Sequence, residues 1–190
     1  QADNHLTSVY NQLGLNNATD AEKYARLDDI NARLDAINAA QRMNVKTTGT
    51  INERLVELAL KAHAPRSWYH LRQGNYDWLG DFGISAYPLS LVVSVKSFKA
   101  KERLLVSGTG TLYAPTIGWG RFDDPNEFGL ERLKTYLFRG FLAIYMPPRT
   151  LERLEPASLQ LVNQYERPFI RSINNFGNDL RGAKILPNQI

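Results

Sequence analysis

Apolar residues between Tyr24 and Ile37 recur at spacings of three and four, and the other face carries the charged residues Arg26, Asp28, Asp29, Arg33 and Asp35. This period predicts an amphipathic helix. Thr19-Asp20-Ala21-Glu22 has the pattern of a capping box that begins it, and we expect the helix to run to Met43. The apolar stripe is narrow and consists of Leu27, Ile30, Leu34 and Ile37. It therefore either packs on the core of its own chain or forms a coiled-coil-like seam between two copies.

Further helices are predicted on both sides of the middle of the chain. One runs from Ile51 to His63, with Leu55, Leu58 and Ala62 on its inner face and Pro65 beyond its end. Asp124-Pro125-Asn126-Glu127 places Asp at the N-cap and Pro at the first helical position, so another helix begins there and ends at Gly140. Short helical pieces are expected around Ser158–Tyr165 and Phe169–Phe176.

Four segments have the composition of β-strands, and they predict an α/β fold. The runs are Asp81–Ala86, Leu91–Lys96, Thr111–Ala114 and the fully apolar Phe141–Met146. A strand, a helix and then an apolar strand indicate a crossover unit with parallel strands. The order of elements from residue 50 is helix, strand, strand, strand, helix, strand.

The first two strands predict a pair of opposite charges at one end of a hairpin. If the turn around Pro88 pairs Ala86 with Leu91, then Ile84 faces Val93 and Asp81 faces Lys96. Ser94 shares the face of Lys96 because strand side chains alternate. A carboxylate and a lysine placed together can hold a divalent metal and stabilise charge on a phosphate. The alternative interpretation is a cross-strand salt bridge without catalytic function.

Composition limits the class of protein. The 190 residues are 43% hydrophobic and 22% charged, which is typical of a globular domain with a core of its own. The chain has no cysteine, so disulfides and thiolate metal sites are excluded. No apolar run reaches the length of a membrane span and no signal-peptide pattern is present, so we expect a cytoplasmic protein without membrane contact. The net charge of +4 permits an anionic partner.

These elements and residues resemble the PD-(D/E)XK nucleases, a superfamily that includes many type II restriction endonucleases. In that superfamily an Asp at the start of one strand is followed, across a hairpin, by acid-X-Lys on the next. Asp81 matches the Asp, and Ser94-Val95-Lys96 matches the second element with Ser94 in place of the acid. The resemblance covers residues 50–146. It implies a nuclease-like core in a single domain, 1–190, with a helical extension at 1–48 and a helical C-terminal part at 147–190.

The resemblance implies hydrolysis of phosphodiester bonds with Mg²⁺. Asp81 would bind the metal, and the backbone carbonyl of Val95 is a further candidate ligand. Lys96 would orient the attacking water or stabilise developing charge, while Ser94 would ligate weakly or through a water. A second carboxylate is sought on the preceding helix, where Glu53 and Glu57 lie one turn apart. The alternative is that both are solvated helix charges.

Two segments are candidates for contact with DNA. Lys99, Lys101 and Arg103 follow Lys96 closely and form either a phosphate-binding strip or a solvated basic loop. The segment 114–124 is interpreted as a rigid, aromatic and polar loop before a helix. There Arg121 is a candidate to read guanine, Asp123 to accept from cytosine and Trp119 to stack or wedge. The alternative is a structural loop whose acidic residues cap the next helix.

The combined hypothesis is a Mg²⁺-dependent, sequence-specific endonuclease for double-stranded DNA that acts as a homodimer. A two-fold dimer would bring two active sites to the two strands of a symmetric target. Two alternatives remain open. One is a DNA-binding module with an inactive nuclease-like core, and the other is an unrelated α/β domain that binds a protein.

Overall fold

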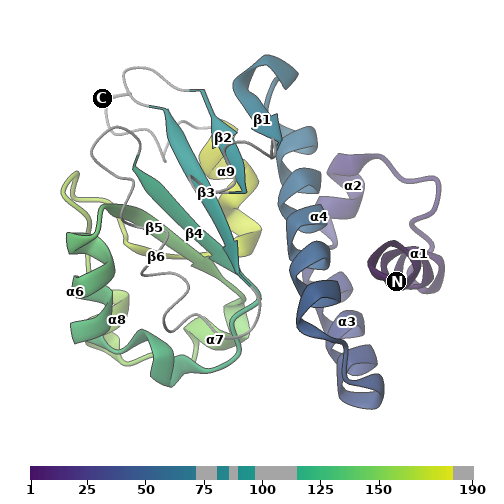
Figure 1. Ribbon diagram of the computed structural model, residues 1–190, viewed down its shortest axis with the longest axis horizontal. Coiled ribbons are helices and arrows are strands. Elements are labelled where there is room, and N and C mark those ends of the chain that lie inside the picture. The colour runs from purple at the N-terminus through teal and green to yellow at the C-terminus, as the bar shows by residue number, and fades with distance from the viewer. Residues whose placement is uncertain (72–80, 86–89, 97–114, 182–190) are drawn as a thin grey trace.

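A computed structural model describes residues 1–71, 81–85, 90–96 and 115–181, which form an α/β fold around a mixed sheet (Figure 1). In the described part of the chain the sheet has six strands in the order β1-β2-β3-β4-β5-β6. The first three are antiparallel, and β3 to β6 are parallel. Their bounds are Tyr69–Leu71, Phe82–Ile84, Leu91–Lys96, Thr116–Gly120, Phe141–Met146 and Ile170–Ser172. The predicted α/β class is therefore confirmed at the level of a mixed sheet flanked by helices.

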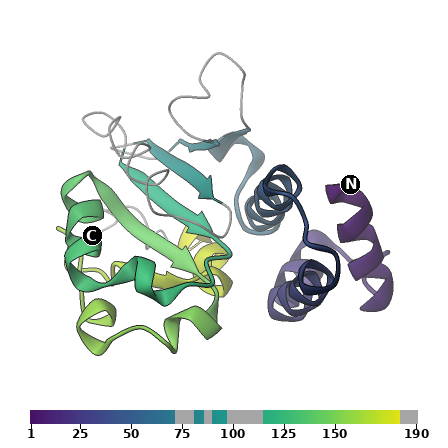
Figure 2. The ribbon, with the colours of Figure 1, turned by 60° about the horizontal axis from the view of Figure 1, so that its bottom comes forward.

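The N-terminal helices form a layered extension on one side of this sheet (Figures 1 and 2). They are α1 (Ala2–Gln12), α2 (Asp20–Ala25), α3 (Leu27–Gln41) and α4 (Val45–His63). Helix α4 contacts β3, while α1 and α2 both contact α4, so α4 is the layer next to the sheet. None of the described helices is long and apolar enough to cross a membrane.

The predicted capping box is present, but the helix that it begins is interrupted. The Thr19 side chain accepts from the Glu22 N–H, and the Glu22 carboxylate accepts from the Thr19 N–H. Helix α2 then ends at Ala25, and α3 begins at Leu27, because Arg26 leaves helical geometry with φ −104° and ψ 23°. The expectation of one continuous helix to Met43 was therefore wrong.

The narrow apolar stripe packs inside its own chain. Leu27, Ile30 and Leu34 are fully buried in the same core cluster as Leu55 and Leu58 of α4. This corrects the basis on which a dimer seam was predicted, because the stripe already has an intrachain partner. The first of the two interpretations, packing on the core of its own chain, is the one observed.

The C-terminal half supplies strands β4, β5 and β6 and the remaining helices. Two 3-10 turns, η4 (Pro125–Phe128) and η5 (Ile173–Asn175), accompany α6 (Leu130–Phe138), α7 (Pro148–Leu151), α8 (Pro156–Leu159) and α9 (Phe176–Arg181). The expected helix after Asp124 is thus a 3-10 turn followed by α6, although Asp124 does cap it by accepting from the Asn126 N–H. The expected helical piece at Phe169–Phe176 is instead occupied by β6 and η5.

The alternation of side chains along β5 separates two cores. Tyr145 belongs to the cluster that α4 and α9 cover, while Ile144 and Met146 belong to the cluster that α6 covers. Helix α9 packs against α4 on the first of these faces. The sheet is therefore enclosed between α4 with α9 on one face and α6 on the other, at least over its central strands.

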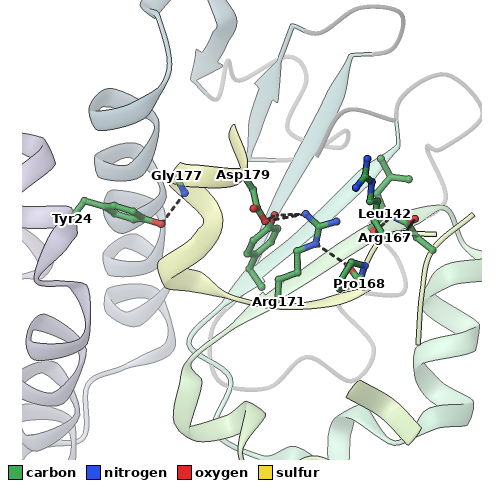
Figure 3. Close-up of polar contacts among 9 residues, drawn as sticks. Tyr24, Leu142, Arg167, Pro168, Arg171, Gly177 and Asp179 are labelled. Atoms are coloured by element: carbon green, nitrogen blue, oxygen red, sulfur yellow. Dashed lines mark hydrogen bonds and ion pairs between the residues drawn. The ribbon is translucent and has the colours of Figure 1, made fainter. Parts of the chain in front are cut away.

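Buried polar contacts attach the C-terminal elements to this frame (Figure 3). The Tyr24 hydroxyl donates to the Ile173 carbonyl at 2.6 Å and accepts from the Gly177 N–H at 3.0 Å. Arg171 of β6 donates to Asp179 of α9 at 2.9 Å, and the Tyr145 hydroxyl donates to the same carboxylate oxygen at 2.7 Å. Burial raises the pKa of Tyr145, so the hydroxyl keeps its proton for this bond.

Candidate functional site

The start of β2 and the end of β3 bring together the two charges at the centre of the sequence hypothesis. Lys96 Nζ lies 3.7 Å from Asp81 Oδ2, and the two side chains are 20% and 15% exposed. The Val95 N–H donates to the same Asp81 oxygen at 2.6 Å. Both contacts use Oδ2, so Oδ1 is the oxygen by which Asp81 can reach a further group.

The hairpin register differs from the predicted one by two residues. The structure pairs Ile84 with Leu91 and Phe82 with Val93, and the Asp81 N–H donates to the Val93 carbonyl at 2.9 Å. Continuing this register puts Asp81 opposite Ser94, with Lys96 as a diagonal neighbour. A shift of two keeps every side chain on its predicted face, whereas a shift of one would have separated the charges. Asp81 and Lys96 therefore still meet.

The backbone around Val95 adds a second oxygen at the same edge. The N–H and C=O of a strand residue point to the same neighbouring strand. The Val95 N–H points to Asp81, so its carbonyl is also directed towards the side from which β2 approaches. Ser94 is fully buried and has a contact of its own, so its hydroxyl is enclosed in the fold rather than open to solvent.

Glu57 of α4 is paired with other charged residues of its own helix. Its carboxylate forms ion pairs with Arg54 at 3.0 Å and with Lys61 at 2.8 Å. Partial burial alone would raise the pKa of Glu57, but the hydrogen bonds from Lys61 and Arg54 outweigh it and hold the pKa below its ordinary value. Glu57 is thus a charged residue of a helix-surface network. Glu53 has a contact of its own as well.

Trp119 and Arg121 lie in the core instead of on a DNA-facing loop. Trp119 belongs to β4 and is fully buried, and Arg121 directly follows that strand and is also fully buried. Arg121 donates to Asp35 of α3, and Asp35 also accepts from Arg149. Neither Trp119 nor Arg121 can reach a base in this position, so the predicted roles in stacking and in reading guanine are corrected to structural ones.

The remaining predicted DNA contacts have different outcomes. Asp123 is exposed, and its backbone carbonyl accepts from Arg153 at 3.1 Å, so its side chain stays a candidate. Lys99, Lys101 and Arg103 lie outside the described residues, and the phosphate-binding strip stays a prediction. The expected strand at Thr111–Ala114 also lies outside them.

Two residues near Lys96 were not found from the sequence. Asn52 of α4 donates through Nδ2 to the Lys96 carbonyl at 2.7 Å, and Gly120 of β4 is paired with Lys96. The available signal for Asn52 was an amide among the apolar residues Ile51, Leu55 and Val56 of a helix.

The described residues alone do not form a multi-carboxylate metal centre. Among residues 1–71, 81–85, 90–96 and 115–181, no group of three or more His, Cys, Asp or Glu side chains gathers. The donors near Lys96 are the Asp81 carboxylate and the Val95 carbonyl. Such a set suits Mg²⁺, which prefers oxygen ligands and keeps several of its waters.

Comparison with protein-family models, with curated proteins and with solved structures finds no match to this chain.

Proposed function

We propose that this chain is a Mg²⁺-dependent endonuclease that hydrolyses double-stranded DNA, of the type II restriction endonuclease kind. The observation that carries the proposal is the 3.7 Å approach of Lys96 Nζ to Asp81 Oδ2 across adjacent antiparallel strands. Both side chains are partly exposed, so a substrate has access to them. Asp81 and Lys96 are also the two residues to which the resemblance assigns the Asp and the Lys of a PD-(D/E)XK nuclease, which supports the proposal.

The arrangement of strands supports the same proposal. Helix α4 precedes an antiparallel meander, β1 to β3, and the sheet continues through the parallel strands β4 and β5 with α6 between them. The resemblance stated above calls for a helix, three strands, a helix and a further strand in a mixed sheet. The described elements share the order of a helix, several strands, a helix and a further strand, but four strands, β1 to β4, lie between α4 and α6. The predicted third strand, 111–114, lies outside the described residues.

The proposed roles follow from charge and geometry. Asp81, through Oδ1, and the Val95 carbonyl would hold Mg²⁺, which supplies charge relief on the phosphate and a bound water of lowered pKa. Lys96 would hold that water by hydrogen bonding and stabilise the negative charge that develops on the phosphoryl oxygens. The Val95 N–H fixes the orientation of the Asp81 carboxylate, which leaves the carboxylate preorganised for its ligand.

A second candidate function is a DNA-binding module with an inactive core. Ser94 stands where the acid of the acid-X-Lys element is expected, and it is fully buried. A site with one carboxylate holds Mg²⁺ less tightly than a site with two. Binding of DNA without cleavage would favour this second function.

Incubation with supercoiled plasmid DNA separates these possibilities. With Mg²⁺ the proposed endonuclease yields discrete linear fragments, and chelation of the metal by EDTA stops the reaction. A gel-shift measurement on the same DNA detects an inactive binding module. Absence of both cutting and binding would reject both functions and leave the protein-interaction domain.

A matched pair of lysine variants assigns the activity to this site. Lys96→Ala removes the proposed catalytic ammonium. Lys134→Ala removes an exposed lysine of α6 that pairs with Glu131 at 2.7 Å and so serves as the control. Loss of cutting in the first variant alone supports the proposal, while equal cutting by both would refute the site.

A further inference from the structure

Helix α4 carries a buried amide that stability does not explain. Asn52 is fully buried in a stretch of the helix where Ile51, Leu55 and Val56 are fully buried apolar residues. Its Nδ2 donates to the Lys96 carbonyl, but its Oδ1 has no hydrogen-bond partner among the described residues. A buried polar atom without a partner is unfavourable, and a leucine, which has the same branched shape, would carry no such atom. The presence of the amide is therefore best explained by its hydrogen bond to the Lys96 carbonyl.

On the β4 side, Gly120 leaves the space that the Lys96 carbonyl occupies. A Cβ atom at position 120 would lie 2.6 Å from the Lys96 carbonyl oxygen and 2.6 Å from Phe122 Cζ. Both distances are far below ordinary contact, so a side chain at this position would displace the carbonyl or the ring. Two elements thus shape one site: α4 supplies the donor, and β4 leaves the space.

This carbonyl belongs to the residue that carries the proposed catalytic ammonium. Lys96 is the last residue of β3, and a strand end is held by fewer neighbours than a strand centre. The bond from Asn52 restrains the peptide plane that follows the Lys96 Cα. The direction of the Lys96 side chain depends on this backbone geometry, and so does its distance from Asp81.

We infer that Asn52 is a positioning residue that fixes the end of β3, so that the Lys96 ammonium stays in register with the Asp81 carboxylate. The inference rests on the proposed function, because Lys96 is the group that is positioned. Misplacement of a catalytic group by about 1 Å costs on the order of 100-fold in rate. The bond to a backbone carbonyl leaves DNA contacts untouched, so the effect falls on kcat and not on KM.

The first test replaces the amide by an apolar side chain of the same branched shape. Asn52→Leu should lower kcat for plasmid cutting by about 100-fold, with KM changed by less than about threefold. The matched control is Asn31→Leu on α3, because Asn31 is also a buried amide and both of its polar atoms lack partners. The control should keep the wild-type kcat. A folded Asn52→Leu variant with the wild-type kcat would overturn the inference.

A readout that is independent of activity separates this inference from the proposed function. The Val95 N–H, which donates to Asp81, reports on the end of β3 through its hydrogen-exchange rate. Asn52→Leu should speed this exchange by more than the accompanying loss of global stability accounts for, because the Lys96 carbonyl loses its donor. Asn31→Leu should leave the exchange unchanged. If the wild type does not cut DNA but these exchange results hold, the nuclease proposal fails and the positioning role stands. Unchanged exchange in Asn52→Leu overturns the positioning role whether or not the wild type cuts.

A second variant approaches the same carbonyl from the other side. Gly120→Ala should also lower kcat without changing KM, because its methyl group would displace the Lys96 carbonyl. The control is Gly83→Ala in β2, where a Cβ would meet only His70 Cβ at 3.9 Å. If Asn52→Leu does not fold, this pair decides: wild-type cutting by a folded Gly120→Ala variant overturns the inference, and a selective loss of kcat supports it.

Discussion

Lys96 Nζ lies 3.7 Å from Asp81 Oδ2 although the two residues are diagonal neighbours and not direct cross-strand partners. The diagonal position leaves both side chains partly exposed at the end of the hairpin. An ion pair of this kind contributes little to stability, about 0–1 kcal/mol. A function in catalysis and a function in stability therefore predict different results for the same substitution.

Lys96→Ala should abolish Mg²⁺-dependent cutting and lower the free energy of unfolding by no more than about 1 kcal/mol. The reason is that the lost ammonium acts on the phosphate and not on the fold. Initial rates of plasmid cutting and a urea unfolding curve measure the two effects. A variant that cuts at the wild-type rate would show that Lys96 is only half of a salt bridge.

Two substitutions of Asp81 should separate its metal-binding role from its structural role. In Asp81→Asn an amide oxygen can still accept from the Val95 N–H, whereas Asp81→Ala leaves that N–H without its partner. Both variants should lose cutting, but only Asp81→Ala should lose stability, by about 1–3 kcal/mol. Calorimetric titration with Mg²⁺ should show weaker binding in both. Normal metal binding by Asp81→Asn would remove Asp81 from the ligand set.

The charge pair could be predicted because any register shift by an even number of residues keeps Asp81 and Lys96 on the same face of the sheet. The β-branched run Leu91–Lys96 identifies a strand from local composition, and it was found with the observed bounds. The pairing of that strand depends on the geometry of the turn, for which local composition gives only weak information. The predicted register was wrong by two residues, yet Asp81, Ser94 and Lys96 remained on one face.

Arg121→Ala should destabilise the fold by about 3–5 kcal/mol, because it removes a fully buried guanidinium that is paired with Asp35. Burial lowers the pKa of Arg121, and the Asp35 carboxylate opposes that shift without cancelling it. The matched control is Arg149→Ala, because Arg149 pairs with the same carboxylate but is 46% exposed. The control should cost less than about 1 kcal/mol. Denaturant unfolding measures both values.

One result for Arg121→Ala would contradict this structural role. If Arg121→Ala kept the wild-type stability and lost discrimination at one base pair of the DNA target, Arg121 would be a base-reading residue after all. With the observed burial, any loss of DNA cutting should follow the loss of folded protein and be equal on all sequences.

The burial of Trp119 and Arg121 could not be predicted because its cause is distant in the sequence. Thr116–Gly120 contains glycines, which are more typical of a loop than of a strand. The sequence therefore did not predict this strand, which is buried at every position. Arg121 was taken as a surface residue because an arginine is rarely buried without a partner. Its partner, Asp35, lies on α3, and no local pattern connects the two.

Leu27→Asp combined with Leu34→Asp should unfold the protein. Both leucines are fully buried in the intrachain core that α3 shares with α4, so each carboxylate would be placed among apolar side chains. Circular dichroism and sedimentation velocity check this result, with Asp29→Asn on the exposed face of α3 as the control. A double variant that stays folded and only changes its association state would restore the dimer seam.

The stability of the fold should fall as the pH is lowered through about 6.5, the ordinary pKa of histidine, because of His63. Burial lowers the pKa of His63, and the positive charge of Arg181 lowers it further. His63 stacks edge-on against Tyr24 at 4.9 Å, and its Nδ1 lies 2.6 Å from Arg181 of α9, so it sits where α4, α2 and α9 meet. Between the lowered pKa and the ordinary value, the unfolded chain binds a proton that the folded chain does not bind. The free energy of unfolding therefore decreases as pH falls through this window and is insensitive to His63 above it.

Urea unfolding between about pH 7.5 and about pH 5.5 should show this slope in the wild type and a smaller slope in His63→Gln, because glutamine does not titrate. His5→Gln on α1 is the matched control and should keep the wild-type slope, since His5 lies away from the junction of α4 with α9. Equal slopes in the wild type and in His63→Gln would mean that protonation of His63 is not coupled to folding. A reduced slope in His63→Gln alone would assign the acid sensitivity to the contact between α4 and the C-terminal helix.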